Sequence, residues 1–253
     1  MSEILRKCSY WLLGGYVAVN LIFFSIPFYY ALPAIFFAAD MYWLQPFVQS
    51  LVISSLAALA AWFPGLGLAI VILNVRQNRL RSALASMIGA FSSFPTILVA
   101  FTGVLYSLHE IPGTLPTVFL LSALLIPYSA NYYLRDLQKL PAGIWDSCHA
   151  LGLDPLATMQ LTIRITAPLT ITVLLSSFSR IIGETMIVYL ITLKQPAIQG
   201  LTANIARIMQ QNPESSFKEL AVFAVLIILV VLITRILAFF LKQKFYRAVY
   251  NVG

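Results

Sequence analysis

The chain has 253 residues, of which 60% are hydrophobic and only 10% are charged, whereas an ordinary soluble domain is about 25% charged. This composition excludes a water-soluble globular domain and predicts an all-α integral membrane protein. The net charge of +7 does not call for a nucleic-acid partner, because basic residues at the cytoplasmic face of a membrane protein contact anionic lipid.

Six apolar stretches follow one another along the chain, and a helix needs roughly 20 such residues to cross the hydrocarbon. They cover residues 8–39, 41–75, 82–108, 111–134, 165–193 and 220–241. The first is about twice as long as the apolar region of a signal peptide, so we read it as an uncleaved helix. We expect six transmembrane helices, with residues 1–44 forming an N-terminal transmembrane helix and residues 45–253 forming one core domain.

The lysines and arginines indicate the orientation of these spans. If the N-terminus is cytoplasmic, twelve of the 16 fall on the cytoplasmic side, three lie in the outer loop at 194–219, and Arg180 lies within a span. This asymmetry predicts that both termini are cytoplasmic. Cys8 and Cys148 then lie where thiols stay reduced, so we expect no disulfide.

The inner loop at 135–164 contains "LPAGIWDSCHALGLDP", which predicts a short helix over about 141–152. Pro141 suits the first turn of a helix, and Gly152 is a natural residue to end one. Asp146 and His149 make the segment too polar to cross the membrane. It is expected at the cytoplasmic surface, where it could dock a partner or simply rest on lipid headgroups.

The outer loop at 194–219 predicts a second short helix. Leu201, Ile205 and Ile208 recur at helical spacing in "LTANIARIMQQN". This helix would either lie over the outer mouth of the bundle or rest inertly at the membrane interface.

The stretch "SRIIGET" places two charges inside the fifth apolar span. On a continuous helix Arg180 and Glu184 share a face because they are four residues apart, and Ser177 lies on the same polar stripe. We expect this polar stripe to face the interior of the bundle and not the lipid. A helix that enters near residue 165 would carry Arg180 about 22 Å into the membrane. A charge at that depth costs about 2.5 to 3.5 kcal/mol on insertion scales, so something must offset it.

Two explanations of Arg180 and Glu184 stay open from chemistry alone. The pair could be a buried ion pair that only orients helices, although desolvation makes such pairs poor stabilisers. Alternatively, the guanidinium offers bidentate donors to a tetrahedral anion, while the carboxylate accepts a hydrogen bond from a protonated oxygen. Phosphate carries such a proton near neutral pH and sulfate does not, so this second explanation favours phosphate.

Prolines interrupt the third and fourth spans at Pro95 and Pro127. A proline lacks the N–H that a helix needs, and broken helices in transporters expose backbone groups to the substrate path. Proline kinks also occur in inert spans, so both readings stay open here.

The sequence offers no set of residues for enzymatic chemistry. We expect no catalytic residue, since no nucleophile and base come together at membrane depth, and no metal site, since no His or Cys cluster has ligand spacing. No G-x-x-x-x-G-K-[ST] motif is present, so we expect that this chain holds no cofactor and that any ATP and Mg²⁺ are bound by a partner.

The inner helix resembles the coupling helix of the membrane subunits of ABC importers. That family carries Glu-Ala-Ala, three residues and Gly, and this chain keeps the spacing in "DSCHALG". The resemblance implies that the helix docks on an ATPase subunit. The residues that would make this contact are Asp146, Ser147, Cys148, Ala150 and Gly152. The chain departs from the family further on, where "IRITAP" places Pro168 a few positions away from the usual proline.

The fifth span strengthens this resemblance. "SRIIGETMIVYLIT" looks like the Arg-Ala-(Ile or Leu)-Gly-Glu-Thr-Met-Ala-Val segment of phosphate-specific ABC permeases, and "SSFPTILVAFTGVLYSL" is similar to another of their spans. The likeness covers roughly residues 51–241. It implies a permease subunit with a phosphate path at Arg180, Glu184, Thr185 and Ser177. The alternatives are a permease for another oxyanion (sulfate, molybdate or tungstate) or a secondary transporter. Permeases for sulfate and molybdate tend to continue the motif with Phe.

The resemblance also implies partners and a location. We expect a cytoplasmic dimer of ATP-binding subunits, a second permease subunit that is identical or homologous, an extracytoplasmic substrate-binding protein and the lipid bilayer. The expected location is a bacterial inner membrane.

Overall fold

A computed structural model describes residues 25, 27–33, 42–75, 77–106, 111, 114–138, 150–153, 157, 160–161, 164, 167–184, 187–188, 200–211 and 217–250. The secondary structure in these ranges is helical and includes no strand. The prediction of an all-α membrane protein is therefore confirmed for the part of the chain that is described.

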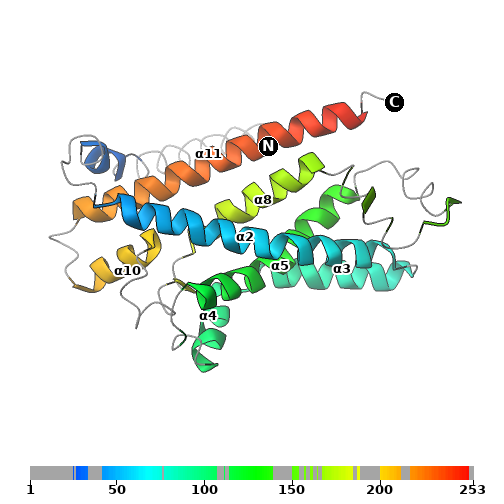
Figure 1. Cartoon of the computed structure of the whole chain (residues 1–253), viewed down its shortest axis with the longest axis horizontal. Helices are drawn as coiled ribbons and strands as arrows, with labels where there is room; N and C mark the ends of the chain where they lie inside the picture. Colours follow the sequence, from blue (N-terminus) through cyan, green and yellow to red (C-terminus); the bar gives the residue numbers. More distant parts are fainter. Residues whose placement is uncertain are drawn as a thin grey trace, which may run out of the picture.

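Three helices are long and apolar enough to cross a membrane. They are α2 (Leu44–Leu73), α5 (Leu115–Leu137) and α11 (Phe217–Tyr250). They match the second, fourth and sixth predicted spans. In Figure 1, α2 and α11 run along the long axis of the molecule and α5 packs against α2. Pro127 lies inside α5 without ending it, so this proline does not break its span.

The third predicted span is not one continuous helix. It consists of α3 (Asn78–Ser92) and α4 (Thr96–Leu105), which are bent by 78° relative to each other. Pro95 causes the break, because its extended backbone (φ −63°, ψ 125°) cannot continue a helix and also disfavours helix at the preceding residue. If this bent pair counts as one span, the described residues hold four spans. Six spans stay a prediction, and most of the first lies outside the described residues.

The fifth predicted span is also broken, at residues 182–184, where the chain turns. Helix α8 (Ala167–Ile181) has only 15 residues, and the expectation of an unbroken helix over 165–193 was wrong. At the break, the Glu184 N–H donates to the Ile181 carbonyl at 2.8 Å and not to the carbonyl four residues back. Gly183 lies within this turn, and glycine is a poor helix former.

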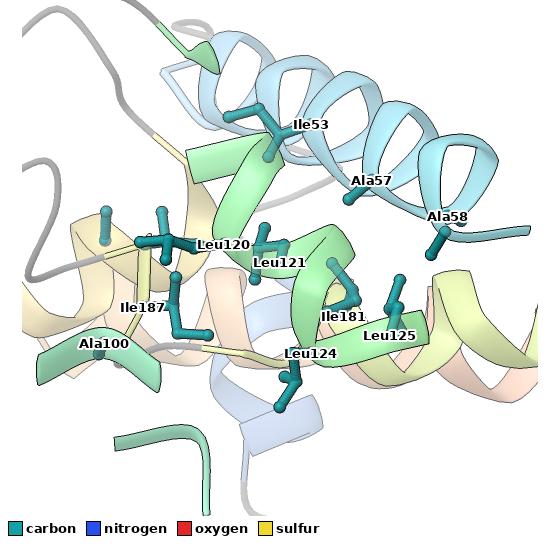
Figure 2. Packing of buried hydrophobic residues seen from close by; sticks show 13 residues of the cluster. Ile53, Ala57, Ala58, Ala100, Leu120, Leu121, Leu124, Leu125, Ile181 and Ile187 are labelled. Atoms are coloured by element: carbon teal, nitrogen blue, oxygen red, sulfur yellow. The ribbon is translucent and has the colours of Figure 1, made fainter. Parts of the chain in front are cut away.

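The centre of the bundle is built where α5 meets α2. In Figure 2, Leu121 and Leu125 of α5 lie among Ile53, Ala57 and Ala58 of α2, and Ile181 of α8 lies beside them. These residues are at most 3% exposed. The alanines present only a methyl group, so the two backbones approach closely.

One glycine shows how close this approach is. A Cβ added to Gly65 of α2 would lie 2.7 Å from the Cβ of Ser129 and 3.2 Å from the backbone nitrogen of Ala130. By contrast, a Cβ at Gly67 would meet nothing within 4 Å. The α2–α5 contact therefore depends on the absence of a side chain at one position.

The short helix predicted in the outer loop is confirmed as α10 (Leu201–Gln211). Its apolar residues Leu201, Ile205 and Ile208 pack in one cluster with Val222 and neighbouring residues of α11. The Leu201 N–H donates to the Ser50 hydroxyl of α2 at 2.7 Å. Contacts with two long helices thus fix α10 against the bundle.

Basic residues gather at one end of the molecule. Helix α2 ends there, α3 begins there, and both α5 and α11 finish there (Figure 1). The basic residues at this end are Arg79, Arg81, Arg135, Lys242, Lys244 and Arg247. Helix α10 and the start of α11, which carry Arg207 and Lys218, lie at the opposite end.

Candidate functional site

Arg180 is held at the point where α3 breaks. Its Nη1 donates to the carbonyl oxygen of Ser92 at 2.8 Å, and its guanidinium carbon lies 4.6 Å from the centre of the Tyr128 ring. Ser92 is the last residue of α3, where the carbonyls have no partner within the helix. A cation at this end also interacts favourably with the helix dipole. The charge of Arg180 is therefore balanced by a helix end and an aromatic face.

Glu184 does not lie on a helix with Arg180, because α8 ends at Ile181. The prediction that the two residues share one helical face was wrong. In the described structure they form no ion pair with each other, but Arg180 and the Thr96 side chain both lie close enough to interact electrostatically with the half-buried carboxyl group. The Thr202 hydroxyl donates to the backbone carbonyl of Glu184 at 3.3 Å.

The polar stripe of α8 faces the bundle, as predicted. The Tyr133 hydroxyl donates to Thr170 at 3.1 Å, and the hydroxyls of Ser177 and Ser129 lie 3.1 Å apart. Ser177 is only 1% exposed. The structure thus places Ser177 in a buried contact between α8 and α5.

The break between α3 and α4 brings further polar groups to the site. Thr96 is the first residue of α4, and the Asn131 amide of α5 donates to the Ser92 hydroxyl at 3.1 Å. The Ser92 hydroxyl in turn donates to the Gly89 carbonyl at 2.7 Å. Sequence reasoning did not identify Ser92, Thr96, Tyr128 or Asn131. The signal that could have found the first two is Pro95, which lies between them.

The other predicted site residues fall partly outside the described structure. Thr185 and the run Asp146, Ser147 and Cys148 lie outside it. Ala150 is helical, and Gly152 has φ +63°, the left-handed conformation expected where a glycine ends a helix. No side chain of the described bundle lies within 4 Å of a Cβ placed there.

Together these features define a class of protein. An arginine of α8 donates to the last carbonyl of α3, at the break in a bent pair of apolar helices, and intramembrane charges at broken helices are typical of transport proteins. This is therefore a helical membrane transport component.

The family is shown by residues 65–248, which match the family described as "Binding-protein-dependent transport system inner membrane component". The match covers more than half of the chain, from the second half of α2 to the end of α11, and the chain belongs to this family. It matches no curated protein sequence. The chain is thus a multi-pass inner-membrane permease subunit of an ABC importer, which works with ATP-binding and substrate-binding proteins.

Proposed function

We propose that this permease subunit forms part of the translocation path for inorganic phosphate, with Arg180 and Glu184 as the residues that contact it. The observation that carries this proposal is the position of a guanidinium and a carboxylate beside the same helix break, without an ion pair between them. A protonated oxyanion needs a strong donor and an acceptor at one place.

Arg180 has donors to offer. A guanidinium carries five N–H groups, and among the described residues only the Ser92 carbonyl takes one of them. The side chain is half-buried, so the remaining donors are not sealed inside the bundle. They suit the paired oxygens of a tetrahedral anion.

Glu184 supplies the preference for phosphate. Its carboxylate accepts a hydrogen bond from the protonated oxygen of phosphate, whereas a sulfate would meet the carboxylate with a like charge. The Thr96 side chain lies close to the same carboxyl group and adds a hydroxyl that can donate or accept. Thr185, next in the sequence, is proposed as a further hydroxyl of this path.

Coupling to ATP hydrolysis is proposed for the segment from Asp146 to Gly152. It follows α5, whose last residues lie at the basic end of the bundle. An excess of Lys and Arg marks the cytoplasmic side, which supports placing this end and both termini in the cytoplasm. There the segment would meet the ATP-binding subunits, which supply the ATP and Mg²⁺ site.

The test is to assemble the chain with its ATP-binding and permease partners in proteoliposomes and to add the substrate-binding protein loaded with phosphate, sulfate or molybdate. We expect phosphate to stimulate ATP hydrolysis and uptake. Stimulation by sulfate or molybdate alone would contradict the proposed substrate and leave the family membership intact. The matched control is the same complex with an unloaded binding protein.

A further inference from the structure

A second cluster of charged and aromatic side chains lies where α5 and α11 finish, away from Arg180. Lys242 of α11 donates to the Asp136 carboxylate of α5 at 2.8 Å, and the Tyr246 hydroxyl donates to the other oxygen of that carboxylate at 3.0 Å. Asp136 is only 1% exposed. The negative charge in this cluster is therefore already neutralised within the protein.

Positive charge remains in excess around it. Tyr132, Arg135, Asp136 and Lys242 line an open cavity of about 150 Å³. Two cations and one carboxylate leave the cavity with a net charge of +1. Arg135 is exposed, and no described residue makes a hydrogen bond or ion pair with its guanidinium. Its fork of donors is left for a ligand.

The ammonium of Lys242 is fixed in place beside this arginine. Its Nζ lies 4.7 Å from the ring centre of Tyr132 and 5.9 Å from that of Tyr246. One of its three N–H donors goes to Asp136, so donors remain on the side of the cavity. A flexible side chain that is already held by its neighbours loses little entropy when it binds an anion.

The depth of the cavity indicates the source of the anion. The candidate membrane span of α11 is Lys218–Arg247, and α11 begins at the opposite end of the bundle (Figure 1). Lys242 is 24 residues beyond Lys218, or about 36 Å along the helix. That exceeds the roughly 30 Å of hydrocarbon, so the cavity lies at the level of the lipid headgroups. Tyrosines such as Tyr132 and Tyr246 are enriched at this level.

We infer that this cavity binds the phosphate group of an anionic ligand, with Arg135 and Lys242 as donors. At this depth the natural source is an anionic phospholipid headgroup, and a soluble phosphate ester is the other source of the same chemistry. This site differs from the proposed substrate path, because its lining residues do not include Arg180 or Glu184. The two sites are neighbours along α5, where the rings of Tyr132 and Tyr128 lie 6.3 Å apart.

The test uses the full-length chain extracted from vesicles that contain phosphatidylcholine and phosphatidylglycerol, with the retained lipids counted by native mass spectrometry. The variant is Arg135→Gln, since this exposed side chain holds no other part of the protein. Removing a hydrogen bond to a charged group corresponds to a tenfold or larger loss, so we expect retained phosphatidylglycerol to fall about tenfold, with phosphatidylcholine unchanged. Arg135→Lys, which keeps the charge, should recover most of it.

Arg247→Gln is the matched control, because Arg247 is an exposed arginine at the same end of α11 and does not line the cavity. Its phosphatidylglycerol count should stay within about twofold of wild type, as expected for weak surface attraction. An equal fall in both variants, or no fall in either, would overturn the inference. Displacement of the lipid by excess glycerol phosphate would assign the site to a soluble ester, and its persistence would assign it to the lipid.

Discussion

Replacement of Arg180 by alanine separates its two roles, because the side chain both holds the end of α3 and offers donors to the proposed substrate. The variant loses a hydrogen bond from a charged donor to Ser92 and a contact with the Tyr128 ring. Such contacts are worth about 1.5 to 3 kcal/mol and about 0.5 to 2 kcal/mol. The free energy of unfolding should therefore fall by roughly 2 to 5 kcal/mol.

The effect on transport should be larger than this loss of stability implies. A bidentate contact with phosphate supplies two charged hydrogen bonds, so its removal costs about 3 kcal/mol or more, a factor above roughly a hundred in the affinity of the path. Arg180→Lys keeps the charge but not the planar fork, and its uptake should lie between those of wild type and Arg180→Ala.

The assay compares phosphate uptake per assembled complex in proteoliposomes, with assembly measured by size-exclusion chromatography. Arg235→Ala is the matched control, because Arg235 also donates one hydrogen bond to a neighbouring helix, at 3.0 Å to the Ser179 hydroxyl. It should lose some stability, though less than Arg180→Ala because no aromatic contact is lost, and keep uptake per complex near wild type. If Arg180→Ala complexes also transport normally once assembled, Arg180 has only a structural role and the proposed contact with phosphate is refuted.

Substitutions at Glu184, Gly65 and Lys242 provide three further tests. Glu184→Gln removes the negative charge of the proposed hydrogen-bond acceptor and should lower phosphate-stimulated ATP hydrolysis about tenfold without lowering sulfate-stimulated hydrolysis. Equal losses for both anions would contradict the proposed role of Glu184. Gly65→Ala should lower the free energy of unfolding by about 1 to 3 kcal/mol through overpacking, measured by thermal melting, whereas Gly67→Ala should be neutral or stabilising by up to about 1 kcal/mol. Lys242→Met leaves the buried Asp136 carboxylate without its cation and should lower the free energy of unfolding by about 3 to 5 kcal/mol. The double variant that also carries Asp136→Leu should recover much of this loss. Equal melting temperatures for the single and double variants would count against the ion pair.

The helices that sequence reasoning predicted well are those set by length and apolar content. Helices α2, α5 and α11 follow long apolar runs, and α10 follows from helical spacing of three apolar residues. Lipid requires every backbone group in such a run to be bonded within the helix. The apolar pattern of the sequence and this backbone requirement were therefore enough to predict α2, α5, α10 and α11 without any knowledge of tertiary contacts.

The breaks were harder to predict, because apolar content does not change where the backbone leaves the helix. Pro95 was recognised as a possible break, but Pro127 has the same local signal and lies in an intact helix. Neighbouring helices decide which proline is accommodated. Gly183 gave an even weaker signal, so the break at 182–184 was not predicted.

The inward direction of Arg180 was correctly inferred from its polar stripe, but its partner was not. The observed partner, the Ser92 carbonyl, lies 88 residues earlier in the chain and exists as a free acceptor only because α3 ends there. The Asp136 and Lys242 pair was missed for a similar reason, since the two residues are 106 positions apart. Contacts of this range depend on how the helices pack.

The close contact at Gly65 restricts how this permease can move. A Cβ at Gly65 would lie 2.7 Å from the Cβ of Ser129, so a sliding motion that brought any α2 residue with a side chain to this point would clash with α5 in the close-packed interior. A piston-like shift of either helix alone is therefore ruled out as a low-energy motion. The backbone can instead bend at the two helix breaks, at residues 93–95 and 182–184. Both breaks lie next to Arg180. A displacement that starts at the basic end would move α2 and α5 together as one rigid unit. The backbone would then change conformation at the two breaks, next to the proposed anion contact.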